Sequence, residues 1–268
     1  MKITSVSALP APSRSPLVAL GAAAALLFSA CGGEAAAPSI TVSTPTATPT
    51  AAAQPSARPA STTAPAQSCA AFVAAEDPFL MRVVDKQRGL PADYRPGDLQ
   101  TLEDRWAVPG FPGATLRAPA AGPMVEMLAA AQAQGVEIRV RSSFRSYAEQ
   151  QRTFQFWVDK DGEAQARRES APAGHSEHQL GTTADVISRA VGAGWELEPE
   201  FGATAEGKWV AAHAHEYGFA ISYPPDSEAI TGYVYEPWHL RYIGKPCAAE
   251  WRTSGLVLVR FLERLAAR

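Results

Sequence analysis

The chain has 268 residues, of which 46% are hydrophobic and 19% charged, and its formal net charge is −3. The near balance of 24 Lys+Arg against 27 Asp+Glu excludes the strongly basic surface of a nucleic-acid-binding domain. Three cysteines are too few for a disulfide scaffold, and they lack the close pairing of a thiolate zinc site.

The first thirty residues have the pattern of an export signal. Lys2 and Arg14 precede an apolar run over 17–28, which is shorter than the roughly 20 residues that a membrane-spanning helix needs. Small residues then precede Cys31, and this short stretch resembles the lipobox of bacterial lipoproteins. The resemblance implies that Cys31 is lipidated and anchors the chain to the outer face of a bacterial membrane. The alternative is an ordinary cleaved signal over residues 1–30, with an incidental cysteine.

Residues 31–68 form the next segment and consist almost entirely of Ala, Pro, Ser and Thr, without any aromatic residue. Such a composition cannot bury enough apolar surface to offset the entropy of ordering, so we expect a disordered tether. All tryptophans and tyrosines lie after it. Residues 69–268 are therefore expected to form one compact domain.

The first half of this domain predicts two helices around one strand. Helically spaced apolar residues followed by a glycine predict a helix over 122–134. Strict alternation of apolar and polar residues over 136–141 predicts a half-buried strand. Ser146 with Glu149 has the spacing of a capping box, which would begin a helix that runs through Trp157.

The second half predicts shorter elements. In chain order they are a strand over 184–188, a helix over 208–217, a strand over 219–223, a largely extended segment over 233–242, and a C-terminal helix over 251–267 with Leu256, Val259, Leu262 and Leu265 facing inward. Strands and helices do not alternate as βαβ units. The predicted fold class is therefore α+β, a small antiparallel sheet flanked by helices.

Four residues have the chemistry of a hydrolytic zinc site. Such a site needs three nitrogen or oxygen ligands and a carboxylate beside the attacking water, which His178, Asp185, His239 and Glu236 would supply. On a regular strand, however, residues 236 and 239 face opposite ways, so the backbone would have to bend near Pro237. From spacing alone, buried and hydrogen-bonded histidines remain an equal alternative.

Three separate motifs resemble one known family. They are the stretch 142–147 with Gln150, the stretch 176–185, and the stretch 230–244. Together they are similar to the VanY-type D-alanyl-D-alanine carboxypeptidases, zinc peptidases of bacterial cell walls. The resemblance spans roughly residues 79–245 and implies the hedgehog-like fold of these DD-peptidases.

By position, the resemblance implies a role for each site residue. His178, Asp185 and His239 fall on the zinc ligands, and Glu236 falls on the general base and acid. Arg145 falls on the arginine that steadies the carbonyl oxygen as it gains negative charge, which a fixed guanidinium is suited to do. The positions near the substrate are Ser176, Gln150 and Ser142.

The expected function is removal of the terminal D-Ala from peptidoglycan stem peptides by a zinc-dependent monomer. An L,D-carboxypeptidase or an endopeptidase on the same scaffold stays open, as does a non-catalytic wall-binding lipoprotein. Cys69 and Cys247 flank the resembling region, and an exported protein meets oxidising conditions. We therefore expect a disulfide between them, with two free thiols as the alternative.

Overall fold

A computed structural model of the chain describes residues 67–188 and 197–267. The predicted signal, Cys31 and nearly all of the predicted tether lie outside the described residues. Among the residues that are described, no helix is both long enough and apolar enough to cross a bilayer.

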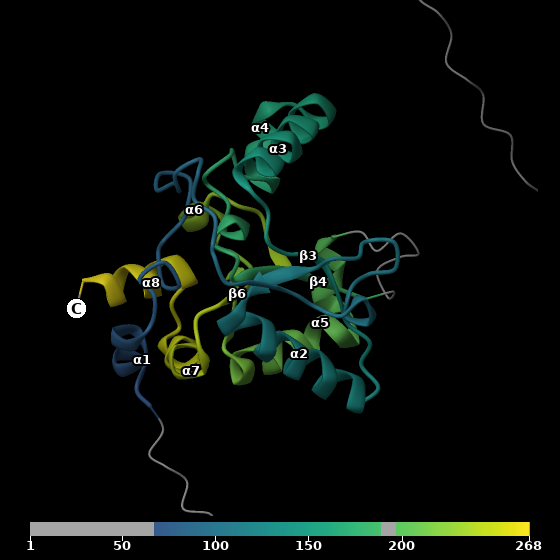
Figure 1. Cartoon of the computed structure of the whole chain (residues 1–268). Helices are drawn as coiled ribbons and strands as arrows, with labels where there is room; N and C mark the ends of the chain where they lie inside the picture. Colours follow the sequence, from purple (N-terminus) through teal and green to yellow (C-terminus); the bar gives the residue numbers. More distant parts are fainter. Residues whose placement is uncertain (1–66, 189–196, 268) are drawn as a thin grey trace, which may run out of the picture. The chain divides into compact units, whose positions relative to one another are not determined.

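A four-stranded antiparallel sheet lies at the centre of the domain (Figure 1). Its spatial order is β3 (Arg139–Ser142), β4 (Thr183–Ile187), β6 (Glu236–Tyr242) and β5 (Phe219–Tyr223). A separate hairpin-like pair joins β1 (Leu99–Thr101) to β2 (Thr115–Arg117). The sheet and the helices around it confirm the α+β prediction.

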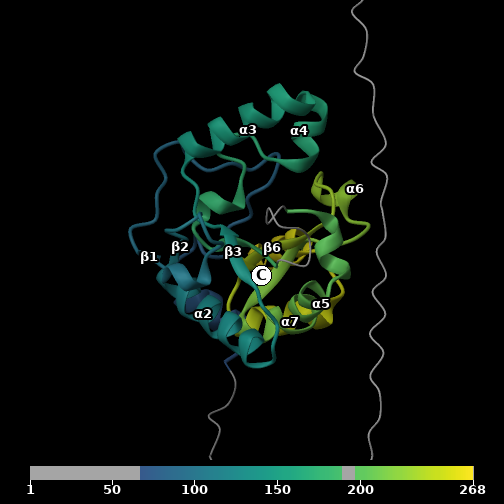
Figure 2. The same ribbon diagram turned by 90° about the vertical axis from the view of Figure 1, so that its right-hand side faces the viewer.

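The helices lie on both sides of this sheet. They are α1 (Cys69–Ala75), α2 (Ala118–Ala133), α3 (Tyr147–Asp161), α4 (Glu163–Glu169), α5 (Ala205–His213), α6 (Glu228–Thr231), α7 (Lys245–Ser254) and α8 (Leu258–Ala266). Helices α2, α5 and α7 lie on one side, whereas α3 and α4 lie on the opposite side (Figures 1 and 2).

The alternation of strand side chains separates the core from the site. In β4, Ala184 and Val186 join the hydrophobic core, and so does Leu240 in β6. Successive strand residues point to opposite faces, so Asp185 and His239 point away from that core. The polar face of the sheet is therefore the face toward α3.

Local sequence signals predicted several elements well. The capping box at Ser146 and Glu149 is present and begins α3. Strand β5 has the predicted bounds of 219–223. The predicted strand over 136–141 is displaced, because β3 begins only at Arg139.

The prediction of one C-terminal helix over 251–267 is wrong. The segment contains the end of α7 and the separate helix α8, and Gly255 between them has φ 67°. This left-handed conformation ends a helix and favours glycine, so α8 begins anew at Leu258. Leu262 is buried as predicted, whereas Leu256 falls in the break.

A disulfide joins the first residue of α1, Cys69, to Cys247 in α7. Helix α1 has only seven residues and buries Phe72, whose ring packs against Gly244 so closely that a Cβ there would come within 2.2 Å. An isolated helix this short is unstable in water. The covalent bond and the Phe72 contact therefore hold α1 on the domain.

We predict that the free energy of unfolding of the double variant Cys69→Ala/Cys247→Ala is about 2–4 kcal/mol lower than that of the oxidised wild type, as is typical for loss of a native disulfide. Urea denaturation of oxidised and reduced wild-type protein beside the variant measures this difference. Reduced wild type should resemble the variant. Equal midpoints for the oxidised wild type and the variant would contradict the prediction.

Candidate metal centre

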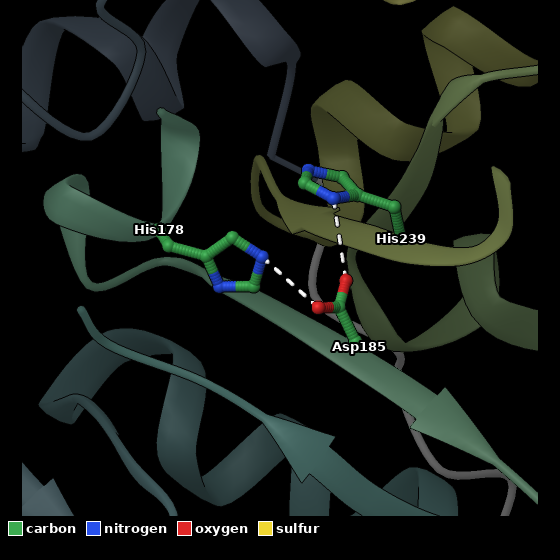
Figure 3. Close-up of side chains that lie close together, drawn as sticks. All are labelled: His178, Asp185 and His239. Atoms are coloured by element: carbon green, nitrogen blue, oxygen red, sulfur yellow. Dashed lines mark ion pairs between the residues drawn. The ribbon is translucent and has the colours of Figure 1, made fainter. Parts of the chain in front are cut away.

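Three buried side chains from different elements converge on one point. His178 comes from the short 3-10 helix Glu177–Leu180, Asp185 from β4 and His239 from β6, and one ligand atom of each lies within 4.8 Å of the others (Figure 3). Gly181, with φ 75°, lets the chain turn sharply between His178 and Asp185. A Cβ at Gly181 would also come within 2.9 Å of Arg117 Cγ.

The ring of His178 is oriented for metal binding by its outer nitrogen. Its Nδ1 donates to the carbonyl oxygen of Ser143 at 2.7 Å, so a neutral ring carries its lone pair on Nε2. That Nε2 faces Asp185 Oδ2 at 3.2 Å. Burial lowers the pKa of His178, which favours the neutral ring. Two acceptors thus face each other, an arrangement that a cation between them would stabilise.

His239 has the same arrangement with its nitrogens exchanged. Its Nε2 lies 3.0 Å from Glu177 Oε2, and its Nδ1 lies 3.3 Å from Asp185 Oδ1. Although burial opposes charge on this ring, its bonds to Asp185 and Glu177 raise the pKa of His239 to about 10. Without a metal the ring is therefore protonated on both nitrogens at neutral pH. A metal ion that binds Nδ1 would displace the proton on that nitrogen.

Asp185 completes a donor set that fits a divalent metal. Burial favours its neutral acid, but His178 and His239 hold the pKa of this carboxyl well below its ordinary value. Its Oδ1 is buried and accepts no well-aligned hydrogen bond from the described part of the chain. Two imidazole nitrogens and one carboxylate oxygen, all buried, are the ligand types of catalytic zinc sites. The residues present therefore fit such an ion.

A bulge in the sheet brings Glu236 to the same site. Tyr223 pairs with Glu236 and Ile221 pairs with Leu240. Between these two pairs the chain advances four residues along β6 but only two along β5, which is a bulge in β6. The extra residues bend β6 beside Pro237, and Glu236 Oε2 then lies 3.4 Å from His239 Nδ1. Burial raises the pKa of Glu236 to about 8, although His239 acts in the opposite direction. The required bend is thus present.

A buried ion pair behind His239 was missed by the sequence analysis. Arg241 is fully buried, and its Nη1 lies 2.9 Å from Glu177 Oε1. Burial alone would raise the pKa of Glu177, but Arg241 and His239 hold it down at about 2. Ser222 Oγ also donates to this carboxylate at 2.6 Å. One signal was available, because Arg241 lies two residues after His239 and so shares its strand face.

The predicted arginine and two of the predicted substrate residues form one cluster. Arg145 donates to Gln150 Oε1 and to Ser142 Oγ, both at 2.8 Å. Gln150 in turn donates to the carbonyl oxygen of Ala171 at 2.6 Å. Ser142 and Gln150 therefore orient the guanidinium. Ser176 is buried and caps the 3-10 helix by accepting from the backbone N–H of His178.

These groups line one cavity of about 480 Å³, within the usual range for small-molecule and peptide sites. Arg145, Gln150, Ser176, Glu236 and the three candidate ligands all contribute to its wall. Further lining residues come from α3, α4, the segment 197–199, and the aromatic side chains of Tyr223, Tyr233 and Trp238. Tyr223 and Tyr233 had no predicted role.

Comparisons with known proteins agree with this geometry. A family model described as "VanY: D-alanyl-D-alanine carboxypeptidase" matches residues 113–245. The putative carboxypeptidase YodJ of Bacillus subtilis (strain 168) is 39% identical over 187 residues, which cover 69% of this chain and 68% of that protein.

Two solved structures are similar to the fold. The LdcB LD-carboxypeptidase aligns with a TM-score of 0.62 at 39% identity, covering 69% of this chain and 86% of that one. The vancomycin resistance D,D-pentapeptidase VanY, in complex with Zn(II), aligns with a TM-score of 0.57 at 27% identity, covering 69% and 99%. These neighbours confirm the predicted fold family.

We predict that Glu177→Gln lowers the unfolding free energy of the metal-free protein by about 3–5 kcal/mol, because Arg241 would stay buried without its anion. Chemical denaturation measures the change. The matched control is Glu126→Gln, which removes an exposed ion pair with Lys245 and should cost about 1 kcal/mol or less. Equal effects of the two substitutions would refute the structural role of the buried pair.

Proposed function

Because the chain belongs to the VanY family of D-alanyl-D-alanine carboxypeptidases, we propose that it is a zinc-dependent D,D-carboxypeptidase of peptidoglycan stem peptides. The observation that carries the proposal is the convergence of His178, Asp185 and His239 with Glu236 in one buried site. All of these residues come from one chain, which supports activity as a monomer.

The ligand chemistry supports zinc as the cofactor. Each histidine has its outer nitrogen bound to a carbonyl or carboxylate oxygen, which fixes the ring and points the inner nitrogen toward Asp185, where a metal would bind. When bound, zinc would polarise the scissile carbonyl and lower the pKa of water, so that hydroxide is available to attack the carbonyl near neutral pH.

Glu236 is suited to move the proton of this reaction. Its carboxylate lies beside the candidate ligands, where the positive charge of a bound metal ion would oppose the effect of burial on the pKa of Glu236 and favour the ionised form that accepts a proton. In the proposed reaction it accepts a proton from the attacking water. It then passes that proton to the amine of the departing D-Ala as the peptide bond breaks.

Arg145 is suited to stabilise the negative charge that develops on the carbonyl oxygen. It is partly buried in the cavity wall, and Gln150 and Ser142 fix its orientation through two hydrogen bonds. A guanidinium held in place before the reaction stabilises such an anion more than a mobile one does.

The main competing function is cleavage of the L,D bond. The LdcB neighbour is an LD-carboxypeptidase with the same level of identity as the B. subtilis relative, so the scaffold accommodates either bond. An endopeptidase on this scaffold and a wall-binding lipoprotein without activity are weaker candidates. A wall-binding lipoprotein without activity would not need the complete set of metal ligands, general base and arginine.

Digestion of defined stem peptides tests the proposal directly. Zinc-loaded protein is incubated separately with a pentapeptide ending in D-Ala-D-Ala and a tetrapeptide ending in a single D-Ala, and mass spectrometry identifies the products. Loss of one D-Ala from the pentapeptide supports the D,D assignment. Cleavage of the tetrapeptide alone would replace it with L,D activity, and no cleavage of either would refute both.

We predict that Glu236→Gln retains zinc but lowers kcat by about 10²–10⁴-fold, the range for removal of a positioned general base. Elemental analysis measures the bound zinc, and the stem-peptide assay measures turnover. Glu126→Gln, on the exposed surface, serves as the control and should turn over at the wild-type rate. Near wild-type turnover by Glu236→Gln would exclude the assigned role.

We also propose that Cys31 is lipidated and tethers the domain to the outer face of a bacterial membrane, on the basis of the predicted export signal and the lipobox resemblance. The variant Cys31→Ser should move from the membrane fraction to the soluble fraction of the host cell. Mass analysis of the N-terminal peptide should detect the acyl chains on the wild type only. Identical fractionation of the two proteins would refute the anchor.

A further inference from the structure

The two histidines of the metal centre are supported at their outer nitrogens by groups of different kinds. The support of His178 is the backbone carbonyl of Ser143, which any residue at that position would offer. The support of His239 is a side chain, the carboxylate of Glu177, whose Oε2 lies 3.0 Å from Nε2. The placement of His239 therefore depends on the identity of residue 177 and on the groups that hold its carboxylate.

The contact at Nε2 decides which atom of the His239 ring faces the site. The ring packs against Tyr223, with the two centroids 4.7 Å apart, and this contact restricts the tilt of the ring. Half a turn about the Cβ–Cγ bond would keep the packing but place a carbon atom where Nδ1 now faces Asp185. The turned ring would also present carbon to Glu177 and lose the hydrogen bond. Glu177 thus selects the orientation in which Nδ1 is the inner atom.

Glu177 also determines which nitrogen of the neutral His239 ring carries the hydrogen. An ionised carboxylate accepts hydrogen bonds and cannot donate them, so the Nε2 that faces it carries a hydrogen. The lone pair of the neutral ring is then on Nδ1, the atom that a metal ion would bind. A fixed orientation and a fixed tautomer are the means by which such outer partners strengthen metal binding.

The carboxylate of Glu177 is itself held at both oxygens. Arg241 Nη1 donates to Oε1 at 2.9 Å, and Ser222 Oγ donates to Oε2 at 2.6 Å. Oε2 is the same oxygen that faces His239. The bond at Oε1 alone would let the carboxylate turn about that contact, so the hydroxyl of Ser222 is what fixes the position of Oε2.

We propose that Glu177 and Ser222 are positioning residues that raise the affinity of the site for zinc, with Ser222 holding Glu177 and Glu177 holding His239. Neither Glu177 nor Ser222 lines the large cavity, so both would act through His239 and not through the substrate. The inference rests on the proposed zinc-dependent function, because it assigns the two residues to the cofactor of that reaction.

The zinc affinity of the metal-free protein tests the assignment without any assay of activity. The dissociation constant is measured by competition with a chelating dye, for wild type and for Ser222→Ala, which keeps the ion pair between Glu177 and Arg241. Loss of one hydrogen bond behind the ligand should weaken zinc binding by about 3- to 10-fold. Ser222→Thr keeps the hydroxyl and should bind zinc as wild type does. A second cavity of about 30 Å³, which Ser222 lines, can take the added methyl group.

Ser227 provides a matched control for Ser222. It is 2% exposed, against 3% for Ser222, and its Oγ also donates a hydrogen bond of 2.6 Å, but to the carbonyl oxygen of Pro224. Ser227→Ala should therefore bind zinc with the wild-type dissociation constant. Equal dissociation constants for Ser222→Ala and Ser227→Ala would overturn the assignment of Ser222.

The variant Glu177→Gln tests the other half of the proposal. Arg241 can only donate, so the amide oxygen of the glutamine would turn to Arg241 and the amide nitrogen would face His239. Zinc binding should weaken by about 10- to 100-fold, the range for loss of such an outer partner. In zinc-loaded, isotope-labelled protein, the Nε2–H of His239 should give a slowly exchanging NMR signal in wild type and not in the variant.

A wild-type zinc affinity of Glu177→Gln, or an unchanged imidazole signal, would overturn the role of Glu177. If this variant does not fold, the comparison of Ser222→Ala with Ser222→Thr and Ser227→Ala decides the proposal. If zinc affinities change as expected but no stem peptide is cleaved, the inference stands and the proposed function fails. If stem peptides are cleaved but all variants bind zinc equally, the proposed function stands and the inference fails.

Discussion

Arg241 is the buried cation around which the site is assembled. One end of its guanidinium binds Glu177, and the other donates to the carbonyl oxygens of Leu80 and Arg82 at 2.8 and 3.1 Å. Glu177 in turn holds the outer nitrogen of His239. A buried charge is tolerated only when it is paired and hydrogen-bonded, so these contacts fix three chain segments relative to one another. The inner nitrogen of His239 is oriented as a result.

The strand that carries His239 combines two requirements that a regular strand cannot satisfy together. Alternation keeps Leu240 in the core and sends His239 and Arg241 to the opposite face, but it would also turn Glu236 away from His239. The bulge opposite Tyr223 removes this conflict by adding residues to β6 near Pro237. The irregularity of the sheet is therefore what brings a proton-carrying group to the candidate metal ligands.

The parts of the molecule that sequence predicted are those governed by local chemistry. The capping box of α3 and the strand β5 depend on neighbouring residues, and both were predicted from them. The candidate ligands were identifiable because their residue types and motifs are distinctive. Glu177 and Arg241 were missed because their partnership spans 64 positions along the chain. The cavity along α3 was missed for the same reason, since its opposite wall comes from distant segments.

The contacts of Arg241 also indicate which part of the chain is needed to fold with an intact site. The stretch that carries the family motifs, residues 113–245, contains every candidate ligand but excludes the two carbonyl groups that receive Arg241. It also stops short of Cys247, the anchor point of α1. Excised on its own, that stretch would keep the reactive groups and lose the scaffold that aims them. The part of the chain needed for an intact site is thus longer than residues 113–245, which carry the family motifs. The additional residues are needed for structural support and supply no candidate ligand.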